Sequence, residues 1–134
     1  MSEENAEIAR RFLAALGRVD YDDAFHCLHT DVVWINTTSF PGSRTITGPR
    51  AVIDFWKTLL ESFETRPEDG LEIESITTTG NRVVAAVRSR AHGAGSGIPV
   101  DVQWALSLTM REDLIERVEI SGDYSGALEA AGLS

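Results

Sequence analysis

Four successive extended runs fill most of the second half of the chain and constrain its fold more than any other feature. They are rich in Val, Ile, Thr and Trp, and they span residues 71–79, 82–92, 99–110 and 114–123. The short segments between them carry Gly, Asn and Asp, the residues that favour tight turns. This pattern predicts an antiparallel meander in which each run pairs with the next.

The alternation within the runs indicates which face of the sheet is buried. The apolar row of the third run comprises Val100, Val102, Trp104, Leu106 and Leu108. In the second run, a neutral row with Val87 and Ser89 opposes a row with Arg88, Arg90 and His92. Turning two arginines and a histidine toward a core without partners would be costly. We therefore predict that the neutral row faces the core.

The fourth run has the same period with one interruption. Leu114, Val118 and Ile120 share one parity, and Ile115 and Glu116 break it. We predict that the first three face the core.

The charged row of the second run has two interpretations. On the outer face it would lie near charged and polar residues of the neighbouring strands, Asp101, Gln103, Arg117 and Glu119. Opposite charges across strands stabilise a sheet modestly. With the strand flipped, Arg88, Arg90 and His92 could instead bind an anionic substrate. We favour the outer-face interpretation, and such a face could also receive a second subunit.

Apolar spacing predicts two helices at the start of the chain and a short strand after them. The first begins at Ser2 and ends near Gly17, with Phe12 on its apolar stripe. Asp20 can cap a second helix that extends through Leu28, and the residues at 29–31 end it. A short extended run follows at 32–36, and then a loop at 37–48.

Two more helices are predicted, one on each side of the four runs. Pro49 opens a helix whose apolar stripe should pack on the sheet. That stripe comprises Val52, Phe55, Trp56, Leu59, Leu60 and Phe63. After the last run, a short helical tail spans Ser125 to Ala131.

Composition limits the partners. The formal net charge of −9 over 134 residues disfavours nucleic acid and anionic membranes, because both repel an acidic surface. A small, neutral or apolar ligand remains possible. Cys27 is the one cysteine, so neither an intramolecular disulfide nor a thiolate zinc cluster is expected. With an acidic N-terminus and no apolar run near the ~18 residues of a membrane span, we expect a cytoplasmic protein.

The order of elements predicts an α+β fold, in which helices collect on one face of a curved antiparallel sheet. Residues 1–134 fit one domain. A sheet curved around N-terminal helices forms a cone, and small inward residues such as Ala85, Ser89 and Ala91 would leave it partly empty. An internal pocket is the resulting hypothesis.

Three local motifs accompany this order. They are Thr30-Asp31-Val32-Val33-Trp34, the Gly48-Pro49 helix start with Phe55-Trp56, and the Glu112-Asp113-Leu114-Ile115 hairpin. Together they resemble the nuclear transport factor 2-like superfamily, which includes SnoaL-like polyketide cyclases, ketosteroid isomerases and limonene epoxide hydrolases. The resemblance implies a cystatin-like α+β barrel and a homodimer formed through the outer sheet face.

The resemblance also assigns functional positions by register. The catalytic base of ketosteroid isomerases corresponds to Asn36, which cannot accept a proton at neutral pH. Their oxyanion-binding Tyr corresponds to Phe12, and their partner acid falls on or near Leu106. The Tyr and Asn that hold water in the epoxide hydrolases correspond to Trp34 and Asn36.

The remaining charged groups of the relatives are also replaced. The Asp-Arg-Asp set of the epoxide hydrolases falls on Ile120, Val87 and Ser89, and the cyclase base also falls near Ile120. A one-residue slip in the second run would place Arg88 and Arg90 on those positions instead.

These considerations give a set of candidate site residues. Asn36 is the catalytic candidate, as a group that polarises a carbonyl or positions a water; the alternative is an Asn that bonds the loop after its strand. The predicted pocket wall, or plain core, comprises Phe12, Trp34, Phe55, Trp56, Leu59, Val87, Ser89, Trp104, Leu106, Val118 and Ile120. His26 and His29 have a spacing that a helical metal site could use, but we expect surface or helix-end histidines, no metal and no cofactor.

We therefore predict a SnoaL-like small-molecule protein with an apolar cavity, and two functions remain open. It could be an isomerase, cyclase or hydrolase for an apolar cyclic, polyketide-like or terpenoid-like compound. The alternative is a non-catalytic ligand-binding or dimerisation module that has lost the acid–base residues of its relatives.

Overall fold

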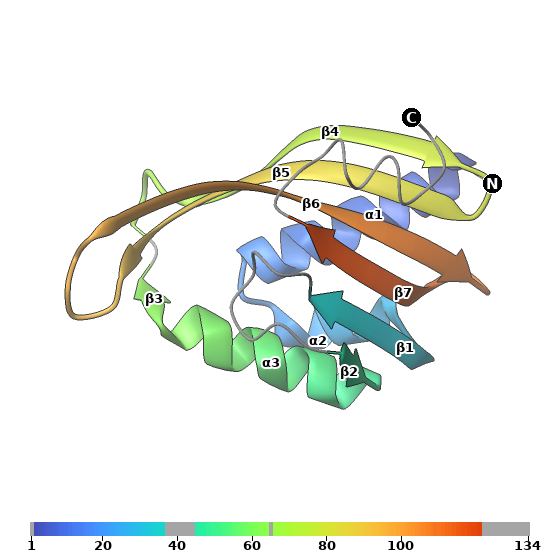
Figure 1. Ribbon diagram of the computed structural model, residues 1–134, viewed down its shortest axis with the longest axis horizontal. Coiled ribbons are helices and arrows are strands. Elements are labelled where there is room, and N and C mark those ends of the chain that lie inside the picture. The colour runs from blue at the N-terminus through green and yellow to red at the C-terminus, as the bar shows by residue number, and fades with distance from the viewer. Residues whose placement is uncertain (1, 37–44, 65, 122–134) are drawn as a thin grey trace.

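The computed structural model describes residues 2–36, 45–64 and 66–121, so the predicted tail helix and most of the predicted loop at 37–48 lie outside the described residues. These described residues form three helices and seven strands (Figure 1). The helices are α1 (Ser2–Gly17), α2 (Tyr21–His26) and α3 (Pro49–Glu61). The strands are β1 (Leu28–Asn36), β2 (Thr45–Thr47), β3 (Phe63–Glu64), β4 (Gly70–Thr79), β5 (Arg82–Gly93), β6 (Pro99–Arg111) and β7 (Leu114–Ser121).

The seven strands form one curved, unclosed sheet in the order β2-β1-β7-β6-β5-β3, with β4 also paired to β5. Strands β4 to β7 are antiparallel neighbours, which confirms the predicted meander. The sheet is nevertheless mixed, because β1 runs parallel to β7. This α+β arrangement is the predicted fold class.

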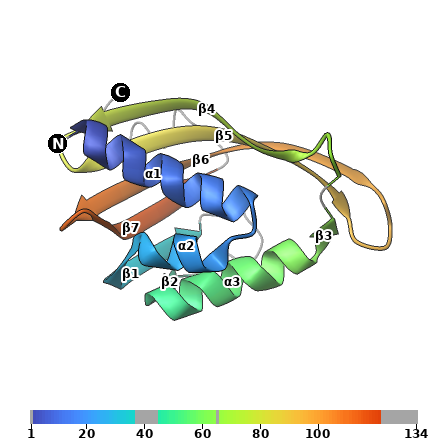
Figure 2. The same cartoon turned by 180° about the vertical axis from the view of Figure 1, so that it is seen from behind.

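The helices lie on the concave side of the sheet (Figure 2). Helix α1 ends at Gly17 as predicted, and Phe12 and Leu13 are fully buried. Pro49 occupies the first turn of α3, and Trp56 packs against Trp104 of β6 with ring centroids 5.9 Å apart. The predicted packing of α3 on the apolar face is therefore confirmed. None of the helices in the described residues is long and apolar enough to cross a membrane.

The boundary between α2 and β1 differs from the prediction. Asp20 caps α2 through Asp23 N (3.1 Å), as expected, but the helix ends at His26 and β1 already begins at Leu28. The reason is tertiary pairing: Ile115 N donates to Cys27 O (2.8 Å), and Leu28 pairs with Ile115. Strands β2 and β3, of three and two residues, were not predicted.

A β-bulge in β7 corrects the predicted parity of that strand. Met110 pairs with Ile115 while Thr109 pairs with Arg117, so Glu116 is an extra residue. Ile115 and Val118 consequently both face the core at 0% exposure, and Leu114 is only partly buried. The break in the sequence pattern was visible, but its effect on parity depends on the partner strand.

The orientation of β5 agrees with the prediction. Val87 is fully buried, and its neighbour Arg88 donates from Nε and Nη2 to Asp101 at 2.8 and 2.6 Å on the face away from the helices. This hydrogen-bonded ion pair lowers the pKa of Asp101. The observed register therefore contains no slip that would place Arg88 inside.

The apolar row of β6 is buried along only part of its length. Val102 is 47% exposed, contrary to the prediction of one continuous dry face. At this end, β5 and β6 extend beyond the other long strands and twist away from the helices (Figure 1). Alternation in the sequence marks the face correctly, but it does not show where the covering layer ends.

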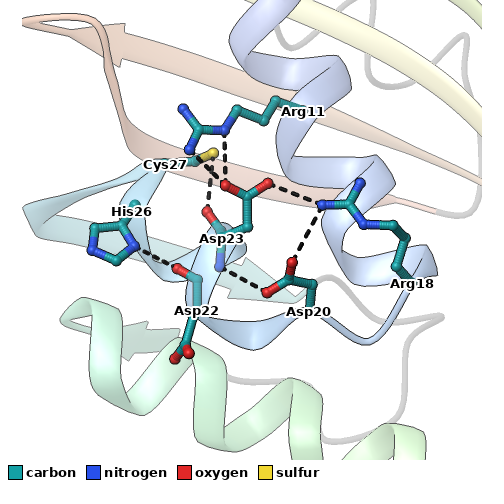
Figure 3. A network of polar contacts seen from close by, with 7 residues as sticks. All are labelled: Arg11, Arg18, Asp20, Asp22, Asp23, His26 and Cys27. Carbon is teal, nitrogen blue, oxygen red and sulfur yellow. Dashed lines mark hydrogen bonds and ion pairs between the residues drawn. The ribbon is translucent and has the colours of Figure 1, made fainter.

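Helices α1 and α2 are joined by a polar network (Figure 3). The Asp23 carboxylate accepts hydrogen bonds from Arg11 Nε (3.0 Å) and Arg18 Nη2 (3.1 Å). The hydrogen bond from Arg11 is the main cause that lowers the pKa of Asp23. Cys27 is buried behind this network, and burial raises the pKa of its thiol, so it has the character of an inert core residue.

Candidate functional site

Aromatic side chains from α1, β1, α3 and β6 meet on the concave side of the sheet. The Trp34 ring contacts Phe12 (centroids 6.0 Å apart) and Trp56 (5.5 Å), and the Trp56 ring also contacts Trp104 (5.9 Å). Phe55 lies against Trp56 at 6.0 Å. We call Phe12, Trp34, Phe55, Trp56 and Trp104 the aromatic cluster. Aromatic side chains of this kind also line sites for ring compounds.

Two polar side chains border this cluster and accept hydrogen bonds from its indoles. Trp34 Nε1 donates to Asn36 Oδ1 at 2.9 Å, and Trp104 Nε1 donates to Ser89 Oγ at 2.8 Å. Asn36 is only 4% exposed, at the end of β1 beside Ile120 of β7. The Trp34 contact fixes the orientation of the amide, with Oδ1 toward the indole. Asn36 is thereby a positioned polar group at the edge of an apolar surface.

The other predicted wall residues gather around the same core. Val87, Leu106, Val118 and Ile120 are fully buried, and Leu59 packs against them from α3 while partly buried. The structure thus brings the predicted set together on the concave side. Whether these side chains line a ligand cavity stays a prediction.

The positions assigned by resemblance carry no acid or base. Phe12, Leu106 and Ile120 are apolar and fully buried. Among the described residues, the polar residues that are buried as a whole are His29, Asn36 and Ser107. Of these, Asn36 is the one hydrogen-bonded to the aromatic cluster. Chemistry at this site would rest on polarisation or water placement by an amide.

The two histidines near Cys27 do not share a helix face. His26 ends α2 and donates from Nδ1 to Asp22 O (2.7 Å), whereas His29 lies in β1 at 8% exposure. The prediction of surface or helix-end histidines is therefore confirmed for His26 and wrong for His29. Its Nδ1 accepts from Asp31 N (3.0 Å), and its Nε2 lies 3.6 Å from Glu112 Oε1. The contact with Glu112 links β1 to the β6–β7 turn.

The described residues also form a hollow of about 190 Å³ beside the charged row of β5. Its lining includes Glu68, Asp69 and Glu72 on one side and Arg88 and Arg90 on the other. Glu68 and Asp69, with nearby His92, are a group whose ligand atoms lie close enough to hold a metal ion. Sequence reasoning missed this group, because 23 residues separate Asp69 from His92 and only the strand register brings them together.

The element order, the curved sheet and the helix-covered concave face define the nuclear transport factor 2-like α+β class. The model of the SnoaL-like domain family matches residues 9–118. The chain belongs to this family of small-molecule proteins. The comparison with curated proteins gives no match.

Several solved structures share the fold. A putative SnoaL-like polyketide cyclase from Jannaschia sp. CCS1 is 21% identical, with a TM-score of 0.77 over 90% of this chain and 85% of the other. A hypothetical protein with a ketosteroid isomerase-like fold from Catenulispora acidiphila, in complex with trimethylamine, is 19% identical, with a TM-score of 0.75 over 96% and 94% of the chains. The putative hydroxylase AclR from Streptomyces galilaeus is 16% identical, with a TM-score of 0.75 over 100% and 88%. At these identities the likeness establishes the fold alone.

Proposed function

We propose that the protein binds a small, largely apolar cyclic compound against the aromatic cluster, with Asn36 as the main polar contact. The observation that carries this proposal is the buried amide of Asn36, held by Trp34 Nε1 at 2.9 Å beside the connected aromatic rings. An apolar site with few polar groups selects uncharged ring compounds, because it cannot compensate the desolvation of a charge. Polyketide-like and terpenoid-like compounds are the substrate classes that we propose.

The reaction that we propose is an isomerisation, cyclisation or hydrolysis assisted by the Asn36 amide. An amide can donate to a developing oxyanion or hold an attacking water, and neither task requires it to change its protonation state. The related fold of a putative polyketide cyclase supports the cyclase alternative. In this proposal, residues 1–134 act as one SnoaL-like domain without a cofactor.

One observation favours a second function, binding without turnover. The positions of acids and bases in the relatives are occupied here by the buried apolar residues Phe12, Leu106 and Ile120. A protein with this site could retain or present a ligand without converting it. The two functions share the ligand site and differ only in chemistry.

Thermal-shift screening with steroid-like, terpenoid-like and polyketide-like compounds, followed by turnover assays on each binder, separates the two functions. For the enzyme, we expect a binder to be converted and Asn36→Ala to lower turnover. Asn81→Ala, on the exposed β4–β5 turn, is the matched control and should change neither binding nor turnover. Binding without conversion would support the binding module. If no compound of the three classes binds, the proposed ligand class is wrong.

We also propose that two copies associate through the outer sheet face. This face carries both charge signs, in pairs such as Arg88–Asp101 and Arg117–Glu119. A face with both signs can complement itself across a two-fold axis. Light scattering after gel filtration should give the mass of a dimer, and Arg88→Glu should shift it toward the monomer. A monomeric wild type would refute this association.

A further inference from the structure

The turn that leads into β4 holds the Asp69 carboxylate in a fixed place. Asp69 N donates to Arg66 O (2.9 Å), and Arg66 N donates in return to Asp69 Oδ2 (2.9 Å). The Asp69 side chain is 4% exposed. Both hydrogen bonds close the same turn and restrain the Asp69 carboxylate.

His92, near the end of β5, faces this carboxylate across the strand pair. Its Nδ1 lies 2.7 Å from Asp69 Oδ2, and its side chain is 12% exposed. Burial alone would raise the pKa of Asp69, but the hydrogen bonds from Arg66 and His92 outweigh burial, and the pKa is lowered. Asp69 is therefore a carboxylate at neutral pH, and its Oδ2 accepts the hydrogen bond from His92 Nδ1.

Glu68 completes a set of three potential ligand atoms. Its carboxylate oxygen, an Asp69 oxygen and a His92 nitrogen all lie within 4.8 Å of one another. Zinc binds His nitrogen and carboxylate oxygen at about 2.0–2.2 Å, so two ligands of one ion lie about 3–4 Å apart. Small side-chain rotations would bring these three atoms to that separation. Among the described residues, the hydrogen bonds to Asp69 use Oδ2, and neither Asp69 Oδ1 nor the Glu68 carboxylate accepts one.

The hollow of about 190 Å³ lies beside two of these three residues. Glu68 and Asp69 line it directly, so an ion held by them would face open space rather than packed side chains. That space has room for the waters that complete a coordination shell. Glu72 adds a further negative charge to the lining, and the two arginines of the lining, Arg88 and Arg90, lie 2.6 and 3.8 Å from Asp101. Because Asp101 offsets part of their charge, a cation in the hollow would meet mainly the carboxylates of Glu68, Asp69 and Glu72.

We propose that Glu68, Asp69 and His92 form a binding site for one divalent transition-metal ion of the zinc class. One imidazole nitrogen and two carboxylate oxygens bind the ion, and water fills the positions that face the hollow. The ion replaces the proton on His92 Nδ1, which is released to solvent on binding. The site lies apart from the aromatic cluster and does not depend on the proposed ligand.

Isothermal titration of chelator-treated protein with Zn²⁺ alone tests the proposal, and Co²⁺ absorption reports the ligand geometry. We expect one equivalent to bind, and Glu68→Gln and His92→Gln to weaken binding by about tenfold or more, as loss of a ligand should. His26→Gln removes a comparable histidine outside the cluster and should leave the affinity unchanged.

Glu68→Gln decides between a metal site and a purely structural hydrogen bond. Glu68 is exposed, so the variant should fold like the wild type. If His92 and Asp69 only stabilise the turn, His92→Gln would lower the thermal midpoint. In that case, Zn²⁺ would either not bind at all or bind equally well to wild type and Glu68→Gln. Either result would overturn the proposal. Weaker binding in Glu68→Gln with an unchanged thermal midpoint would support it.

Discussion

Replacing Asn36 by Ala tests the geometry on which the candidate site depends. The substitution removes the acceptor of the Trp34 indole, whose side chain is fully buried. An indole N–H that loses its partner in a buried place costs its desolvation free energy, about 1–3 kcal/mol. We therefore expect Asn36→Ala to lower the free energy of unfolding by about that amount.

A double-mutant cycle isolates this hydrogen bond from other effects of the substitution. Trp34→Phe keeps a ring in place but has no N–H, so in that background Asn36→Ala no longer leaves an indole donor without its acceptor. The two changes together should destabilise the protein less than the sum of the single changes, by about 1 kcal/mol. The measurement is urea unfolding followed by far-UV circular dichroism, because fluorescence would be altered by the loss of a tryptophan.

Additive effects, within the error of about 0.3–0.5 kcal/mol that independent sites show, would refute the reasoning. Trp104 provides the matched comparison, since its Nε1 donates to Ser89 Oγ in the same cluster. Ser89→Ala combined with Trp34→Phe should be additive, because each change affects a different indole. If Ser89→Ala and Trp34→Phe show a coupling energy as large as that between Trp34 and Asn36, the cycle measures repacking of the core and not the Trp34–Asn36 hydrogen bond.

The remaining predictions concern the core and the outer face. Leu106→Ala removes a fully buried side chain and should lower the free energy of unfolding by about 2–5 kcal/mol in urea titrations, and a loss below about 1 kcal/mol would indicate that this position is not closely packed. Arg88 lowers the pKa of Asp101 below its ordinary value of 3.8, so this pair stabilises the fold above that pH and ceases to do so as pH falls through the lowered pKa. The urea midpoints of wild type and Asp101→Asn should therefore differ at neutral pH and converge as the pH falls through the lowered pKa of Asp101, and a difference that grows on acidification would contradict the assignment. Asp54→Asn, on the exposed side of α3, is the control for the general effect of removing one acid.

Local signals in the sequence determined much of this fold. The stripe of α1, the Asp20 cap, Pro49 at the start of α3 and the four extended runs all act over a few residues, so their effects can be predicted without knowing the partners. The facing of β5 could also be predicted, because an uncompensated arginine is costly in a core. The observed register of β5 against β6 agrees with this prediction, because it keeps Val87 on the inward face.

Tertiary structure decided what depends on a partner strand. The start of β1 at Leu28 and the inward turn of Ile115 both follow from the pairing of β1, β6 and β7, which local propensity does not contain. The partial cover of β6 depends on where the helices end, and the meeting of Asp69 with His92 depends on strand register. Side-chain periodicity shows which residues share a face, whereas the neighbours on that face are set by long-range contacts that no short window of sequence records.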